Sequence, residues 1–116
     1  MCKTPIAYLL HILEECNYIL SVVTDDLPMY QFLSDETLKR AVCRSLEIVG
    51  EATKKIPADV KFQWSDIHWK HMAGMRDRLI HDYMGVNYLI VWDVAKNIIP
   101  KLQPQIEAVI EKEQSR

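Results

Sequence analysis

Apolar residues recur every three or four positions along most of this chain, and that spacing constrains its fold more than any other feature. Residues spaced in this way share one face of an α-helix, which is then buried against other helices. The pattern fills four stretches, at approximately 4–23, 36–55, 65–85 and 87–110. No stretch has the apolar–polar alternation of a half-buried strand, and only 3 Gly interrupt the chain. The sequence therefore predicts an all-α protein, an up-and-down bundle of four to five helices.

Capping residues and helix breakers set the expected ends of the first two helices. Thr4 is a suitable N-cap, and Pro5 fits the first helical position. The segment Asp25-Asp26-Leu27-Pro28 ends this helix, and a short turn at 29–33 follows. Ser34-Asp35-Glu36 then opens the second helix, which we expect to reach about residue 55.

The third and fourth helices have weaker boundaries. The third is expected to begin near Ser65 and to end near Gly85, a plausible residue just beyond a helix C-terminus. Asn87 is expected to cap the fourth. Pro100 and Pro104 fall inside its apolar pattern, so we expect a kink or a break there.

Length, charge and cysteine content bound the class of protein. A chain of 116 residues suits one domain spanning 1–116, with the polar residues 111–116 expected to fray. The net charge of −2 argues against a protein that coats nucleic acid by charge alone, but it permits a local basic groove. No apolar run reaches the roughly 20 residues of a membrane span. The 3 Cys lack CxxC spacing and follow no signal peptide, which indicates reduced thiols and a cytoplasmic protein.

Three of the four histidines lack a catalytic context. His68 and His71 stand three residues apart, and they would need a third ligand to hold a metal. No HExxH pattern is present, and the neighbouring Trp64 and Trp69 indicate packing. His11 falls near an apolar stripe and is interpreted as structural or exposed. We therefore expect neither a metal nor a cofactor.

The fourth histidine, His81, has neighbours that suit acid–base chemistry. Asp77 lies one predicted helical turn before it, where a carboxylate orients the imidazole and favours its charged form. Arg76 and Arg78 add fixed positive charge. RNA cleavage without a metal needs such groups, because a base must take the 2′-hydroxyl proton and a cation must stabilise the charge that grows on the phosphate. The alternative is a solvated salt-bridge face, which residues at this spacing commonly form.

The spacing of Arg76 and His81 favours a dimeric site. The two residues are five positions apart, which is about 140° around a helix, so a single helix does not direct both at one atom. A two-fold dimer would bring both pairs to a shared groove and double its positive charge. The chain has no Gly-rich phosphate loop and no paired-Asp motif of a nucleotidyltransferase, so we do not expect it to activate ATP by itself.

The same segment resembles a known family. Arg76-x4-His81-x-Tyr83 matches the Arg-x4-His-x-Tyr motif of HepT-type toxins, which are members of the HEPN superfamily. The similarity covers most of the chain, from about residue 8 to residue 106. It includes the segments that flank the motif and one in the second predicted helix: Gly74-Met75, Gly85-Val86, Ile90-Val91-Trp92 and 44–52.

The resemblance implies a fold, an activity and a partner. HEPN proteins of this type are helical bundles that dimerise through the motif helix, with a composite active site in the interface cleft. Arg76 and His81 would be the catalytic pair of a metal-independent endoribonuclease, which leaves a 2′,3′-cyclic phosphate or its opened form. The partner would be a minimal nucleotidyltransferase, the MntA type of antitoxin, in a type VII toxin–antitoxin pair. It would transfer AMP from ATP to Tyr83, and the added phosphates would fill the cleft and repel RNA.

Several residues have two interpretations. Many relatives carry Asn where this chain has Asp77, and a carboxylate there either raises the pKa of His81 or weakens RNA binding. Glu47 and Arg44 either support the site or form an internal ion pair. Tyr83 either is the modified residue or packs in the core, because it continues an apolar helical stripe.

Two other functions stay open at this stage. The chain could be a non-catalytic subunit that binds a nucleotide or substrate for its nucleotidyltransferase partner, an interpretation that Asp77 favours. It could also be a structural interaction protein, in which residues 76–81 form an exposed salt-bridge face. The sequence does not identify the RNA that is cleaved, the number of AMP groups, or assembly beyond a homodimer.

Overall fold

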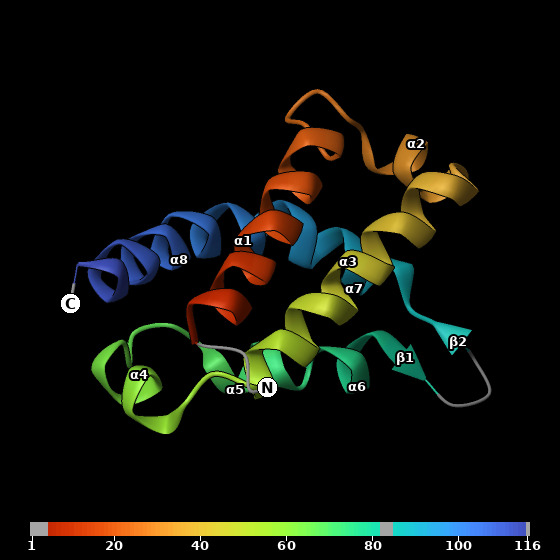
Figure 1. The fold of residues 1–116 in the computed structure, drawn as a ribbon. Helices are drawn as coiled ribbons and strands as arrows, with labels where there is room; N and C mark the ends of the chain where they lie inside the picture. The colour runs from red at the N-terminus through yellow and green to blue at the C-terminus, as the bar shows by residue number, and fades with distance from the viewer. Residues whose placement is uncertain (1–4, 82–84, 116) are drawn as a thin grey trace.

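Three helices form the body of the molecule in the computed structural model, which describes residues 5–81 and 85–115 (Figure 1). They are α1 (Pro5–Val22), α3 (Glu36–Lys54) and α8 (Ile99–Gln114). Helix α1 lies between the other two and packs against both. The shorter helices α5, α6 and α7 pack against α3. The predicted all-α bundle is confirmed.

Apolar stripes at the predicted spacing build the core. On α1 the buried residues are Leu9, Ile12, Cys16 and Ile19, which recur every three or four positions. The matching stripes of the other two long helices are Val42, Leu46 and Val49 on α3, and Leu102, Ile106 and Val109 on α8. Each of these side chains is at most 4% exposed, so the long helices are held together mainly by burial of apolar surface.

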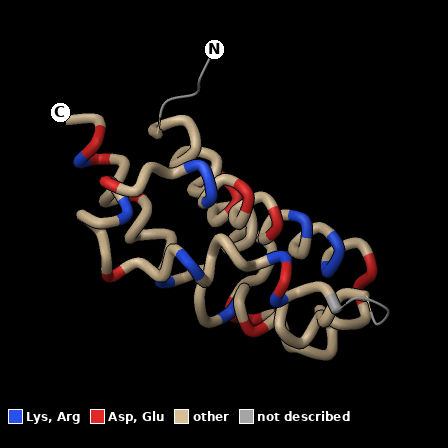
Figure 2. Tube along the Cα trace, turned by 90° about the horizontal axis from the view of Figure 1, so that it is seen from below, with Lys and Arg blue, Asp and Glu red and all other residues tan. Residues whose placement is uncertain are grey.

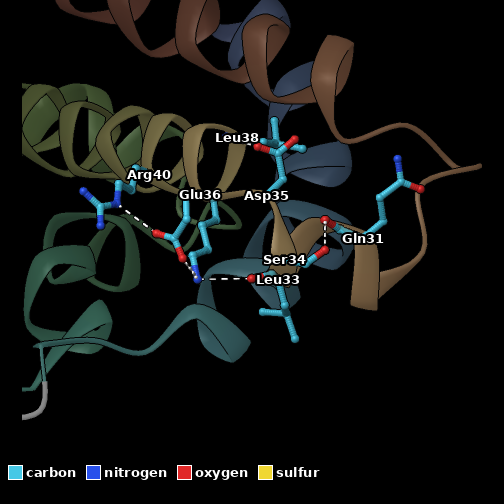
Figure 3. A network of polar contacts seen from close by, with 8 residues as sticks. Gln31, Leu33, Ser34, Asp35, Glu36, Leu38 and Arg40 are labelled. Carbon is cyan, nitrogen blue, oxygen red and sulfur yellow. Dashed lines mark hydrogen bonds and ion pairs between the residues drawn. The ribbon is translucent and has the colours of Figure 1, made fainter.

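A polar network fixes the beginning of α3 (Figure 3). The side chain of Asp35 accepts a hydrogen bond from the backbone N–H of Leu38 at 2.9 Å, which makes it the N-cap. Lys39 Nζ lies 3.0 Å from Glu36 Oε1 and donates to the carbonyl of Leu33 at 3.1 Å. The hydrogen bond from Lys39 lowers the pKa of Glu36. These contacts tie the start of α3 to the segment before it.

The segment expected as a turn at 29–33 is instead a short helix, α2 (Met29–Ser34). Phe32 explains this difference, because it is fully buried and its ring lies 5.2 Å from that of Trp92 on α7. A second unpredicted helix, α4 (Ala58–Gln63), begins after Pro57 and buries Val60. Both helices are too short to form alone, and tertiary packing stabilises them.

The prediction of one continuous helix at 65–85 is wrong. The segment consists of α5 (Trp69–Ala73) and α6 (Met75–Leu79), followed by two short antiparallel strands, β1 (Ile80–His81) and β2 (Gly85–Val86). The chain turns to extended backbone at Ile80, and Gly85 has a φ of 74°, which favours glycine. The backbone N–H of Asn87 closes the hairpin by donating to the carbonyl of Leu79 at 2.7 Å.

The expected irregularity near the prolines lies upstream of them. Asn87 caps α7 (Tyr88–Asp93) through two backbone N–H groups, as predicted. A π-helix, η2 (Val94–Ile98), joins α7 to α8, and the N–H of Ile99 donates to the carbonyl of Val94. Pro100 cannot donate to the preceding turn, and the wider turn accommodates it. Helix α8 continues through Pro104 and into the polar tail that was expected to fray.

None of the described helices has the length and apolar character of a membrane span.

Candidate active site

The motif segment borders a groove of about 350 Å³. Arg76 and Asp77, both exposed on α6, form one wall of this groove. Lys54, at the C-terminal end of α3, contributes a second cation to it, and Ala73 and Ile80 complete the lining. We refer to these five residues as the Arg76 groove. The predicted site therefore has a real cavity beside it, with positive charge from two elements.

A close approach between helices brings Lys54 to the motif. Gly50 on α3 faces the α5–α6 segment, and a Cβ at this position would lie 3.0 Å from the carbonyl oxygen of Met72 and 3.2 Å from Cβ of Met75. Only glycine lets the backbones meet at this distance without displacement. Lys54 is one helical turn beyond Gly50 and so reaches the same side. The sequence does not reveal Lys54 as a site residue, because this approach depends on tertiary packing.

The charge of the groove is mixed. Lys54 Nζ lies 3.3 Å from Glu51 Oε1, with both side chains more than half exposed at 51% and 57%. Asp77 adds a carboxylate next to Arg76. Figure 2 shows basic and acidic positions interspersed along the described trace in place of a wholly basic face. Affinity for a polyanion would therefore depend on the local cations of the groove and not on the net charge.

Arg78 differs from Arg76 in its surroundings. Its side chain is half-buried, and its Nη1 is buried without a hydrogen-bond partner among the described residues. Met75 and Leu79, on the buried side of the same short helix, anchor α6 to the core. Arg78 is not part of the groove lining, so Arg76 is the arginine that the groove exposes.

His81 and Tyr83 are placed less completely. The backbone of His81 is in β1, where it pairs with Gly85. The His81 side chain and the whole of Tyr83 lie outside the described residues. Because α6 ends at Leu79, Asp77 and His81 do not share a helix face, and the one-turn relation inferred from their spacing is wrong. For the same reason, the angle of about 140° between Arg76 and His81 does not apply, because no single helix contains both residues.

The two residues proposed to support the site bind each other. Arg44 Nη1 lies 3.6 Å from Glu47 Oε2, and Cys43 Sγ donates to Glu47 Oε1 at 3.7 Å. Burial, with a smaller effect of the Glu47 carboxylate, raises the pKa of the Cys43 thiol to about 11. Neither Arg44 nor Glu47 lines the groove. The structure therefore shows Arg44 and Glu47 as an ion pair and does not place them at the groove.

The remaining sequence candidates lie elsewhere. His68 and His71 stack on each other at 5.5 Å between ring centroids, beside a second pocket. His11 is exposed on α1. Among residues 5–81 and 85–115, no three His, Cys, Asp or Glu side chains gather as metal ligands. Cys16 and Cys43 are buried, as predicted.

Comparison with known proteins identifies the family. The model of the family described as ribonuclease HepT-like matches residues 12–109. A candidate RNase of Caldanaerobacter subterraneus subsp. tengcongensis is 45% identical over 96% of this chain and 98% of its own length. A candidate RNase of Methanocaldococcus jannaschii is 43% identical over 90% and 89%. A protein of Thermococcus cleftensis named as a probable ribonuclease HepT is 40% identical over 82% of this chain and 86% of its own length.

This chain therefore belongs to the HepT-like ribonuclease family, as the motif at 76–83 predicted, and its enzyme class is ribonuclease. No solved structure matches it.

Proposed function

We propose that this protein is a metal-independent endoribonuclease and the toxin of a type VII toxin–antitoxin pair. The observation that carries the proposal is the exposure of Arg76 in a groove that also holds Lys54. Two cations from different elements at one cavity suit a phosphodiester backbone, because each neutralises a phosphate. The membership of a ribonuclease family supports RNA as the substrate. We expect the protein to act in the cytoplasm, where RNA and ATP are present.

Arg76 and His81 carry the reaction in this proposal. His81 takes the proton of a 2′-hydroxyl, and the 2′-oxygen forms a bond to the adjacent phosphorus while the bond from phosphorus to the 5′-oxygen breaks. Arg76 stabilises the negative charge on the phosphate oxygens as it grows. The departing 5′-oxygen takes a proton from water, His81 returns its proton to the solvent, and the products are a 2′,3′-cyclic phosphate and a 5′-hydroxyl. No step needs a metal, since the nucleophile belongs to the RNA.

The complete site is proposed to form between two copies of the chain. Arg76 is on a helix anchored in the core, and His81 follows it in a strand. A two-fold dimer places two such segments at one cleft, so that each cleaved phosphate meets cations from both copies. The homodimer, and any assembly beyond it, is open to direct measurement by sedimentation.

Regulation is proposed to occur at Tyr83. A minimal nucleotidyltransferase antitoxin of the MntA type would bind ATP, and the Tyr83 hydroxyl would attack its α-phosphorus with release of pyrophosphate. The AMP phosphate would then add negative charge to the active-site cleft. Like charge repels the RNA backbone, so the modified toxin would be silent.

The test of catalysis uses purified protein, a mixed-sequence RNA and excess EDTA. We expect cleavage to persist in EDTA, and we expect Arg76→Ala or His81→Ala to lower the rate by about 100-fold or more. Arg40→Ala and His11→Ala are matched controls, because both residues are exposed and distant in sequence from the groove. If Arg76→Ala and His81→Ala cut RNA as fast as the parent, the catalytic assignment is wrong.

The test of regulation uses mass spectrometry of the chain co-expressed with a nucleotidyltransferase encoded beside it. We expect AMP-sized additions on Tyr83 and none on the Tyr83→Phe variant. If the parent protein, in which Tyr83 is unchanged, carries AMP at other residues instead, the assignment of the regulatory site is wrong.

One observation favours a second function. Asp77 lines the groove beside Arg76, and a carboxylate there opposes an RNA backbone. A non-catalytic subunit that binds a nucleotide for its partner would tolerate this charge better. That function predicts no cleavage by the pure protein, together with nucleotide binding in the Arg76 groove.

A further inference from the structure

A second pocket lies beside α5. Its volume is about 340 Å³, and it is enclosed by the loop before α5, the π-helix η2 and the first half of α8. Met72, Ile98 and Leu102 provide an apolar floor, and the remaining lining residues are polar or charged. A cavity of this size that combines an apolar floor with polar groups able to orient a ligand suits a small molecule or a base. We refer to it as the His71 pocket.

Two imidazole rings form one wall of the His71 pocket. His68 and His71 stack with 5.5 Å between centroids and 20° between ring planes, and both residues are exposed. Within the described residues, neither the His68 nor the His71 side chain forms a hydrogen bond. A pre-stacked and exposed pair offers a flat face to a third ring, as aromatic side chains do for unstacked RNA bases. Since the pair is already ordered, little side-chain entropy is lost on binding.

Polar groups at the edge of the pocket suit a nucleotide. The Nδ2 of Asn97 donates to Asp93 Oδ1 at 2.8 Å, which orients the Asn97 amide and leaves its oxygen as an acceptor. Asp66 supplies a second acceptor, and Lys101 supplies a cation. Within the described part of the chain, no ion pair engages Lys101 or Asp66. Acceptors suit the amino groups of adenine, cytosine and guanine, and a lysine suits a phosphate.

The pocket and the groove belong to the same short segment. Met72 lines the His71 pocket, and Ala73, the next residue, lines the Arg76 groove. The two cavities therefore meet α5 at consecutive residues, and this adjacency is the basis for asking whether one RNA strand contacts both. The proposed cleavage reaction has no other role for the His71 pocket.

We propose that the His71 pocket binds a single nucleotide unit, with the base stacked on His71, its amino group bound by Asn97 or Asp66, and its phosphate bound by Lys101. This inference rests on the proposed ribonuclease function where the nucleotide is part of an RNA substrate. The unstacked base of an RNA next to the scissile bond is then recognised here. The chemistry selects bases with an amino group over uracil.

The binding test does not depend on cleavage. Histidine-selective NMR of the wild-type protein follows the ring signals of His68, His71 and His11 during titration with AMP, GMP, CMP, UMP, inorganic phosphate, and a 2′-O-methyl RNA that cannot be cut. We expect the nucleotides and the RNA to shift His68 and His71 but not His11, with UMP the weakest. If no nucleotide and no RNA moves the two signals, the proposal is overturned, whether or not the protein cleaves RNA.

The other outcomes also decide. Equal shifts from inorganic phosphate alone overturn the base-binding part. Shifts from mononucleotides but not from the RNA make the ligand a free nucleotide and overturn the RNA subsite. His71→Ala should weaken nucleotide binding by roughly five- to hundredfold, the range measured for loss of one stacking partner, whereas His71→Phe should retain most of the affinity. If His71→Phe binds as weakly as His71→Ala, stacking is not the interaction.

The consequence for cleavage is tested separately. On a mixed-sequence RNA, His71→Ala should change which bases flank the cleaved bonds, Lys101→Ala should slow cleavage at all of these bonds alike because Lys101 contacts a phosphate, and His11→Ala should do neither. An unchanged pattern in His71→Ala together with an unchanged rate in Lys101→Ala overturns the RNA subsite and leaves the catalytic proposal standing. An absence of cleavage in the wild-type protein contradicts the catalytic proposal alone, because the NMR result stands by itself.

Discussion

Replacing Lys54 by Gln tests whether RNA runs through the Arg76 groove. The substitution removes one positive charge and keeps a side chain of similar shape. Lys54 pairs with Glu51 at 3.3 Å, but both side chains are more than half exposed at 51% and 57%. An ion pair in that setting contributes less than about 1 kcal/mol. We therefore expect the fold to survive and the effect to appear in RNA binding.

The magnitude follows from counterion release. Each phosphate contact with single-stranded nucleic acid contributes about 0.7 to the slope of log affinity against log salt. Between 50 and 200 mM salt, the loss of RNA affinity should therefore be smaller in the variant than in the parent by a factor of about 2.6 for one lost contact. If a two-fold dimer directs both copies of Lys54 at one RNA, the change is about sevenfold. The assay is KM for RNA cleavage measured across this range of salt.

Two further variants give the controls. Lys55→Gln removes the neighbouring lysine, which is exposed and outside the groove lining, and should leave the slope unchanged. Glu51→Gln should have the opposite sign and strengthen RNA binding, because it frees Lys54 from its carboxylate partner. The same change should have a smaller effect when Lys54 is already Gln. Equal losses in Lys54→Gln and Lys55→Gln would refute the reasoning.

Three other predictions concern stability. Asp35→Ala removes the N-cap hydrogen bond to Leu38 and should lower the free energy of unfolding by about 1 kcal/mol; Asp35→Asn should restore most of it in urea unfolding. Gly50→Ala forces a Cβ to 3.0 Å from the Met72 carbonyl oxygen, at a cost of about 1–3 kcal/mol against a helix-propensity gain of about 1 kcal/mol. A Gly50→Ala protein more stable than the parent would contradict this packing. Burial, with a smaller effect of Glu15, raises the pKa of Cys16 from 9.0 to about 12. Folding thus favours the protonated thiol, and stability present below pH 9 is lost between pH 9 and 12, by roughly 1 kcal/mol at pH 10. Cys16→Ala should lack this loss in urea unfolding at pH 8 and pH 10.

The sequence predicted the parts of the fold that local chemistry decides. The end of α1 and the start of α3 follow from helix breakers and capping residues, and Asn87 caps α7 as its side chain suggests. The cap predicted at Thr4 lies outside the described residues. Core cysteines and the apolar stripes of the long helices also follow, because their spacing already selects one face.

Tertiary packing decided what the sequence did not reveal. Met75, Leu79 and Tyr83 continue a helical stripe, but the pairing of β1 with β2 and the positive φ of Gly85 end the helix at Leu79. Lys54 joins the site only because α3 and the α5–α6 segment meet at Gly50. Neither result can be obtained from the spacing of residues on one helix.

The same limit applied to the motif. Its residue types indicated a ribonuclease, and the family comparison confirmed that class. The catalytic roles of Arg76 and His81 and the modification of Tyr83 stay predictions, which the variants above test.

The π-helix η2 has a consequence for how this family can change in length. Its i→i+5 hydrogen bond absorbs one extra residue between α7 and α8. A single deletion within 94–98 would therefore let α7 and α8 join as one regular helix and leave Leu102 and Ile106 facing the core. A single deletion within the regular part of α8 has no such outlet, because it rotates everything beyond it by about 100°. One-residue changes in length should therefore be tolerated at 94–98 and excluded from the start of α8.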